Sequence, residues 1–261
     1  MNRSLQRALL ATYRAAATRG LLARGPGRRA VEAAYLGYKR LFEAGSPKRL
    51  APVVREGSTV IDVGANIGYF TLPFARWVGP HGRVIALEPE AVNFRRLTAR
   101  IASAGLADRS QLFEAAAAER SGRERLAINP AHPGDHKLAA ADALAAADAG
   151  IEIDAHALDD LIAAHPGPPV SFIKIDVQGA ELRVVKGARN LIARDRPAFL
   201  VEIEPGASDS ASELLALLDD LGYGLHAWTR RGAGARQSAE DILAAAETAG
   251  YLDVFCESDA G

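Results

Sequence analysis

Two acidic residues flank a glycine turn in the first half of the chain, at a spacing that suits a nucleoside ligand. The run VIDVGANIGYFT (60–71) begins with short apolar β-formers, turns between Gly64 and Gly68 and then becomes amphipathic. This pattern indicates a buried strand, a tight turn and the start of a helix. Glu88 ends the next strand-like run, about 20 residues beyond Gly68, where a carboxylate can accept hydrogen bonds from both hydroxyls of a ribose. The chain is therefore predicted to bind a nucleoside-containing cofactor.

The turn lacks the glycine pattern of a dinucleotide site. It reads G-x-x-x-G, and Asp62 stands just before it. A carboxylate there would repel a pyrophosphate but would suit a ligand with a cationic amino-acid end, such as S-adenosyl-L-methionine. Gly64 would let the ligand approach the backbone, and Asn66 is one of the few residue types besides glycine that tolerate positive φ. The alternative is an ordinary strand-to-helix turn of an α/β protein, but the two acids favour the cofactor site.

The length and composition of the chain fit a single folded domain with some additional segments. The chain has 261 residues, 49% of them hydrophobic, enough to bury a full core. Its single cysteine, Cys256, excludes an intramolecular disulfide framework and a CxxC metal cluster. No run of 18 apolar residues is present, so no membrane span is expected. We expect a cytoplasmic protein whose N-terminal part could associate with a membrane.

The first 50 residues form a basic head, with eleven Lys and Arg against two acids. Apolar residues at positions 5 to 17 recur at helical spacing between arginines. Such a helix could lie on an anionic membrane as a peripheral contact, or pack beside the catalytic sheet and cover the cofactor site; packing is favoured because its apolar residues are small. We predict a basic helical extension over 1–50 and an S-adenosylmethionine-binding domain over 51–261.

Strand and helix patterns alternate along the remainder. Strands are expected over 110–118, 123–128, 151–155, 170–175, 198–203, 224–228 and 251–257, and helices over 91–104, 158–164, 181–192 and 212–221. Residues 230–237 are predicted to be a loop, and 239–246 at most a short helix. The pattern predicts an α/β fold with about seven strands, helices on both faces and an antiparallel last strand.

Five ordered blocks resemble one family: VIDVGANIGYFTL, ALEPEAVNFRRL, ALDDLI, FIKIDVQGAELRVVKGA and RPAFLVEIEP. Together they are similar to the FkbM family of S-adenosylmethionine-dependent methyltransferases, from about Thr59 to Pro205. The resemblance implies the Rossmann-like class I methyltransferase fold, with strand order 3-2-1-4-5-7-6 and an antiparallel seventh strand. It also implies an O-methyltransferase acting on a hydroxyl of a sugar, glycan or secondary metabolite. Gln178 departs from the family, which commonly has an acid there.

Each candidate cofactor residue has an expected role. Glu88 is expected on the ribose, Asn93 on the adenosine side unless it faces solvent, and Ala116 against the adenine, which lies near the end of the third strand in this fold. The methionine end is expected to contact Asp62, Gly64, Ala65, Asn66 and Gly68.

Methyl transfer requires alignment of an acceptor with an already activated methyl group, and only a weakly nucleophilic alcohol needs a base. Asp176, at a strand's carboxyl end, and His136, in a polar loop, are the candidate catalytic residues. Their alternatives are a helix cap for Asp176 and a solvated loop position for His136. Asp176 with Glu202 or Glu204 could offer oxygen ligands to Mg²⁺. No spacing demands a metal, and none is predicted.

Two other classes of function stay open: an NAD-dependent oxidoreductase, and a methyltransferase-like binding module without catalysis. Nucleic acid is not expected as a partner, because the basic residues are not interleaved with base-stacking aromatics. The acceptor is expected to be a small molecule or a glycan, and the sequence leaves its identity and the oligomeric state open.

Overall fold

The computed structural model of the chain describes residues 47–127, 137–138, 150–204 and 208–259. Most of the basic head, together with His136 and the loop around it, lies outside the described residues. The described part begins with η1 (Pro47–Leu50), a short 3-10 helix whose Leu50 is buried in the core. The domain core therefore includes the last residue that was assigned to the basic head.

In the described residues, the main sheet has eight strands in the order β11-β10-β12-β9-β8-β1-β2-β3. Their bounds are β1 (Thr59–Val63), β2 (Arg83–Leu87), β3 (Ser110–Phe113), β8 (Val170–Ile175), β9 (Ala198–Ile203), β10 (Tyr223–Thr229), β11 (Gly232–Gln237) and β12 (Leu252–Ser258). β12 runs antiparallel to β9 and β10, whereas β3, β2, β1, β8 and β9 are mutually parallel. Without β11 this is the order 3-2-1-4-5-7-6 with an antiparallel seventh strand. The class I methyltransferase fold is confirmed.

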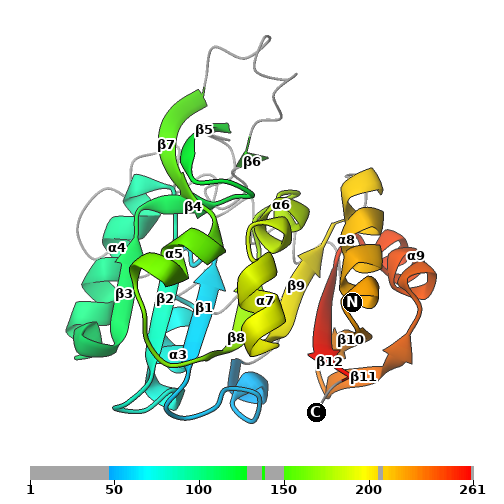
Figure 1. The fold of residues 1–261 in the computed structure, drawn as a ribbon, viewed down its shortest axis with the longest axis horizontal. Helices are drawn as coiled ribbons and strands as arrows, with labels where there is room; N and C mark the ends of the chain where they lie inside the picture. The colour runs from blue at the N-terminus through cyan, green and yellow to red at the C-terminus, as the bar shows by residue number, and fades with distance from the viewer. Residues whose placement is uncertain (1–46, 128–136, 139–149, 205–207, 260–261) are drawn as a thin grey trace, which may run out of the picture.

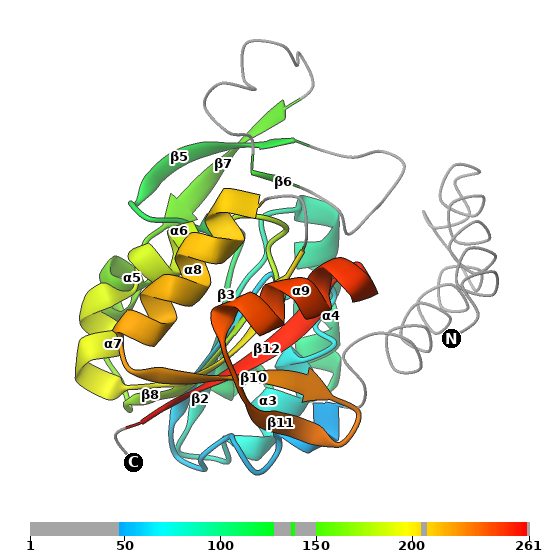
Figure 2. The same cartoon turned by 90° about the vertical axis from the view of Figure 1, so that its right-hand side faces the viewer.

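Helices cover both faces of this sheet (Figures 1 and 2). η1, α3 (Thr71–Trp77) and α4 (Ala91–Ser103) pack on one face, and η2 (Ala107–Arg109) precedes β3. The other face carries α5 (Leu158–Ala164), α6 (Glu181–Lys186), α7 (Arg189–Asp195), α8 (Ser208–Asp220) and α9 (Ala239–Ala249). Neighbouring strand residues point to opposite faces, so Val60 and Ile61 belong to two different core clusters. The layered core thus holds β1 and its following turn from both sides.

A second sheet stands beyond the carboxyl end of β1 (Figure 1). Its described strands are β4 (Ala115–Ala117), β7 (Gly150–His156), β5 (Gly122–Ala127) and β6 (Lys137–Leu138), in that order. The prediction of one strand over 110–118 is wrong, because the chain bends at Glu114 between β3 and β4. β3 pairs with β2, whereas β4 leaves the main sheet to pair with β7.

The predicted helix over 181–192 is also wrong as one element, since it is broken into α6 and α7. At the break, a Cβ on Gly187 would lie 2.2 Å from the carbonyl oxygen of Ala118. The side chain of Asp159 then accepts from the N–H groups of Asn190 and Leu191 over 3.0 and 2.8 Å. The break therefore lets a second helix begin with its first N–H groups satisfied.

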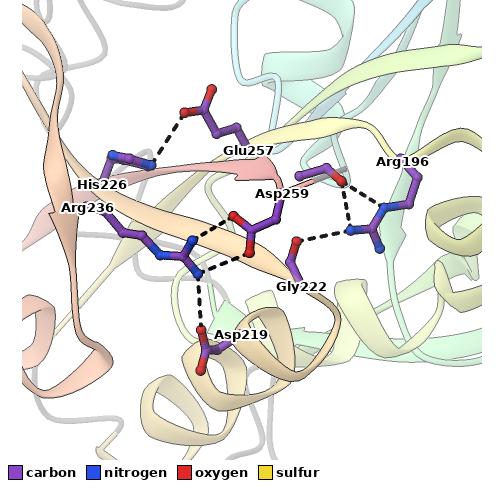
Figure 3. A network of polar contacts seen from close by, with 8 residues as sticks. Arg196, Asp219, Gly222, His226, Arg236, Glu257 and Asp259 are labelled. Carbon is purple, nitrogen blue, oxygen red and sulfur yellow. Dashed lines mark hydrogen bonds and ion pairs between the residues drawn. The ribbon is translucent and has the colours of Figure 1, made fainter. Parts of the chain in front are cut away.

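The region predicted as a loop over 230–237 contains an edge strand, β11, which pairs antiparallel with β10. The helix expected to be short runs as α9 from Ala239 to Ala249, capped by Ser238, whose Oγ accepts from the N–H of Asp241. Polar contacts tie this edge to the end of β12: Arg236 pairs with Asp259 over 2.6 Å (Figure 3). β10 and β11 thus form a hairpin that extends the main sheet. The small residues of β11 did not predict this strand.

Candidate active site

The turn after β1 is held by backbone hydrogen bonds to β2. The N–H groups of Gly64 and Ala65 both donate to the Leu87 carbonyl, over 3.1 and 3.0 Å, and Gly68 N–H donates to the Ala65 carbonyl over 2.8 Å. Gly64 (φ 77°), Asn66 (φ 50°) and Gly68 (φ 82°) are all left-handed, a conformation that glycine adopts freely and asparagine tolerates. The tight turn predicted from G-x-x-x-G is confirmed.

The space left by the missing side chain of Gly64 is filled by protein. A Cβ at this position would lie 1.9 Å from the carbonyl oxygen of Asp176. The N–H of Asp176 in turn donates to the Val63 carbonyl over 3.1 Å. We expected Gly64 to admit a ligand, but it instead admits the backbone at the end of β8. The turn after β1 and the segment after β8 therefore meet directly.

Glu88 is buried beside this turn, with 5% of its surface exposed. Its carboxylate accepts from the N–H of Asn66 over 2.8 Å and from the N–H of Glu90 over 3.0 Å. Burial raises the pKa of Glu88 to about 7, against the opposing effect of these N–H donors. The Glu88 carboxyl therefore lies buried just after the end of β2, and its contact with a ribose stays a prediction.

Asn93 lies in the first turn of α4, where its backbone N–H donates to the capping carboxylate of Glu90 over 2.7 Å. It is 3% exposed, which rules out the solvent-facing alternative. Its side chain acts on Glu88, favouring the ionised form of that carboxyl. Its Nδ2 is buried and makes no hydrogen bond of ordinary length within the described part of the chain. The group on which this amide acts is therefore the Glu88 carboxyl.

A buried polar chain links β1 to β8. Thr71, at the start of α3, donates its hydroxyl to Oδ2 of Asp62 over 2.6 Å. Oδ1 of Asp62 lies 3.9 Å from Nζ of Lys174, which lies 3.1 Å from Oδ2 of Asp176. The Lys174 ammonium also lies 4.8 Å from the centre of the Phe70 ring. The structure therefore places Asp62 and Asp176, predicted for cofactor and acceptor, around one cation.

Sequence reasoning missed Lys174, although a signal was available. The residue is a single lysine in the otherwise apolar or uncharged strand run VSFIKI, and all six positions of β8 are buried. A lysine is almost never fully buried unless it is paired. A carboxylate partner on the neighbouring strand could have been expected on that ground. The alternative role of Asp176 as a helix cap is wrong, because Ala180 occupies the N-cap position of α6.

Glu181 is a second acid at this edge that the sequence reasoning did not single out. It begins α6, is 8% exposed, and accepts from the N–H of Gly179 over 3.0 Å. Burial raises its pKa, and the nearby negative charges of Asp176 and Glu204 act in the same direction. Gln178, which departs from the family pattern, has a left-handed backbone with φ 55°. Strained backbone of this kind gathers at functional sites.

Ala116 is buried in β4 of the second sheet, in register with Ala155 of β7. It therefore belongs to the layer beyond the main sheet rather than to the third strand, where the adenine was expected to lie. His136 lies outside the described residues, so its catalytic role stays a prediction. The structure gathers the other predicted residues at the carboxyl ends of β1, β2 and β8.

Within the described residues, no group of three or more His, Cys, Asp or Glu side chains is arranged to hold a metal ion. Nor does any helix in the same residues combine the length and apolar character needed to cross a membrane.

The comparison with protein families decides the classification. The model described as the methyltransferase FkbM domain matches residues 62–225, well over half of the chain. The chain belongs to the FkbM methyltransferase family. The match begins at Asp62, near the end of β1, and covers the turn, β2, β8, β9 and the buried polar chain, so the family assignment includes the whole candidate site.

The chain is also similar to a named relative and to solved structures. The chain is 30% identical over 185 residues to the 31-O-demethyl-FK506 methyltransferase FkbM of Streptomyces tacrolimicus, covering 61% of this chain and 70% of the relative. The structure of methyltransferase FkbM from Methylobacillus flagellatus KT matches at 20% identity and TM-score 0.47, covering 92% of this chain and 58% of that one. This chain thus spans under two thirds of that protein. The O-methyltransferase from Bacillus cereus in complex with SAH matches at 16% identity and TM-score 0.49, with coverage of 87% and 86%.

Proposed function

We propose that this FkbM-family methyltransferase uses S-adenosylmethionine to methylate a hydroxyl of a sugar, glycan or secondary metabolite. The observation that carries the cofactor assignment is the pair formed by Glu88 and Asn93. The Glu88 carboxylate is buried beside the turn, and the Asn93 side chain favours its ionised form. Ribose hydroxyls are donors, so a nucleoside can donate to this carboxylate.

The remaining residues fit the same ligand. The buried carboxylate of Asp62 suits the ammonium of the methionine end, and the left-handed turn from Gly64 to Gly68 follows it directly. Ala116, buried in β4 beyond the main sheet, is retained as the proposed contact for the adenine. A dinucleotide fits less well, because an acid just before the turn repels a pyrophosphate. These features favour S-adenosylmethionine over NAD.

When bound, this cofactor supplies a methyl group already activated by a sulfonium. The protein then has to orient the acceptor and exclude water. Asp176 is 17% exposed at its side chain and sits at the carboxyl end of β8, held by Lys174 over 3.1 Å. A carboxylate fixed in this way can accept a hydrogen bond from an acceptor hydroxyl and align its oxygen. His136 remains a proposed base.

Oxygen as the methylated atom is proposed from the chain's similarity to the 31-O-demethyl-FK506 methyltransferase, whose name describes methylation at an oxygen. The acceptor is proposed to be a small molecule or a glycan rather than nucleic acid. Contact of the basic N-terminal residues with an anionic membrane is retained as a proposal, since eleven Lys and Arg occur in residues 1–50.

Calorimetric titration with S-adenosylhomocysteine tests the cofactor assignment without an acceptor. We expect the folded wild type to bind, and Glu88→Gln to weaken binding by roughly tenfold or more, because it loses charged hydrogen bonds to the ribose. Glu119→Gln is the matched control, since Glu119 is exposed, and it should bind like the wild type. A folded wild type that binds NAD but not S-adenosylhomocysteine would refute the proposal, as would one that binds neither.

A further inference from the structure

Lys174 is a buried ammonium ion between two carboxylates on neighbouring strands. It is 4% exposed and lies in register with Asp62 across the parallel pair β1 and β8. Asp176 is two residues further along, on the same side of the strand. The Nζ atom lies 3.1 Å from Oδ2 of Asp176 and 3.9 Å from Oδ1 of Asp62. The Lys174 ammonium therefore interacts with two acids to which the proposed function gives different ligands: the cofactor for Asp62 and the methyl acceptor for Asp176.

The surroundings restrict how this charge can respond. The other carboxylate oxygen of Asp62 accepts from the Thr71 hydroxyl over 2.6 Å, which fixes the orientation of that carboxylate. The Phe70 ring lies 4.8 Å from Nζ, and the side chain of Lys174 is only 5% exposed. Solvent therefore screens these charges weakly. Any change in the charge of one acid is then felt by the other through Lys174.

We propose that Lys174 is a positioning residue that couples the methionine end of the cofactor site to the acceptor side. The inference rests on the proposed function, in which Asp62 faces the ligand ammonium and Asp176 the acceptor hydroxyl. While Asp176 is ionised, it draws the Lys174 ammonium away from Asp62. Loss of the Asp176 charge lets Lys174 pair more fully with Asp62, which weakens the attraction of Asp62 for the ligand ammonium.

The test is Asp176→Asn, measured in the wild type and in a Lys174→Met background, by calorimetry with two ligands. S-adenosylhomocysteine carries the amino-acid end, whereas 5′-methylthioadenosine carries only the adenosine and thioether. In the wild-type background we expect Asp176→Asn to weaken S-adenosylhomocysteine binding roughly fivefold, in the range usual for coupled charges. Binding of 5′-methylthioadenosine should stay unchanged. In the Lys174→Met background the same substitution should leave both affinities unchanged.

Several outcomes overturn the proposal. Equal losses in both backgrounds would mean that Asp176 acts on the ligand directly, and equal losses for both ligands would mean a general structural effect. An unchanged affinity for S-adenosylhomocysteine in Asp176→Asn alone would also refute it, whether or not the lysine variant folds. Lys174→Gln replaces Lys174→Met if the latter does not fold.

Two further measurements, on a lysine control variant and on the wild type, distinguish failure of the coupling through Lys174 from failure of the proposed function. Lys186 pairs with Glu213 over 3.6 Å near the surface, so Lys186→Met should leave the effect of Asp176→Asn intact. Failure of the wild type to bind S-adenosylhomocysteine would refute the proposed function. Binding by the wild type without the coupling would refute only the role of Lys174.

Discussion

At the scale of single residues, Glu88 carries the clearest pH signature of the site. Its pKa is raised from the ordinary 4.5 to about 7, chiefly by burial. The native ligand-free protein therefore holds a proton between these values that the unfolded chain has lost. This carboxyl contributes stability to the ligand-free fold below about pH 4.5, and that contribution is lost as the pH rises through about 7.

Ligand binding should depend on pH in the opposite sense. Ribose hydroxyls donate to the ionised carboxylate, so the complex favours loss of the Glu88 proton. We expect the affinity for S-adenosylhomocysteine to rise roughly tenfold between pH 6 and pH 8 and then to level off. Calorimetry in buffers of different ionisation enthalpy should also detect a released proton below pH 7. Glu88→Gln should bind weakly with no such rise, and a rise of equal size in that variant would assign the effect to another group.

Glu88 and Lys174 differ in how far their positions in the site could be predicted from the sequence. The position of Glu88 just after β2 could be predicted because it depends on spacing along the chain, which the sequence displays directly. Lys174 depends on the register between β1 and β8, whose strands are more than a hundred residues apart. The room left by Gly64 was misjudged for the same reason, since Asp176 fills it from β8.

At the scale of elements, the break between α6 and α7 is a point of contact with the second sheet. Gly187 has a negative φ of −81° with ψ 3°, a conformation that residues other than glycine also adopt, so any cost of a side chain there comes from overlap. A Cβ would lie 2.2 Å from the Ala118 carbonyl oxygen, at the point where the chain leaves β4. The backbone is held on both sides, because Gly187 O accepts from the Asp159 N–H over 2.9 Å.

Gly187→Ala should therefore lower the free energy of unfolding by about 1–3 kcal/mol, the range for overpacking, as measured by urea denaturation. Gly150→Ala is the matched control, because its Cβ would meet its nearest neighbour only at 3.5 Å. That variant should be neutral or slightly more stable, since alanine restricts the unfolded chain. Equal stability of the two variants would show that the break has room to relax.

Strands with local signatures were predicted, whereas the separation of β4 from β3 and the edge strand β11 were not. β1, β2, β8 and β9 consist of short apolar runs that end at polar turns. β4 consists of three alanines whose strand state depends on β7, beginning some 35 residues later. β11 reads GAGARQ, with no β-branched residue, and it is a strand because β10 offers a free edge.

At the scale of the whole molecule, the second sheet is joined to the main domain by few polar contacts in the described residues. One of them is the ion pair between Arg183 of α6 and Glu124 of β5. Both side chains are partly buried, and the pair joins α6, the helix after the Asp176 segment, to β5, the strand that neighbours β7. Arg123, the residue before Glu124, forms its ion pairs to the described residues within the second sheet, with Glu152 and Asp154.

This difference yields a prediction about how the two sheets move. Arg183→Ala should increase amide hydrogen exchange in 122–127 and 150–156, because the second sheet loses a tie to α6, while β1 and β8 keep their protection. The loss in global stability should be small, about 1 kcal/mol or less, since the pair is only partly buried. Arg123→Ala is the matched control, because it removes an arginine of β5 whose partners lie on β7 and leaves the contact with α6 intact. Amide hydrogen exchange in that variant should change little. Equally faster amide exchange in both variants would mean that strand pairing, rather than the contact with α6, holds the second sheet in place. Faster exchange in Arg183→Ala alone would make that contact the hinge between the second sheet, which carries Ala116, and the main sheet, at whose edge Glu88 lies.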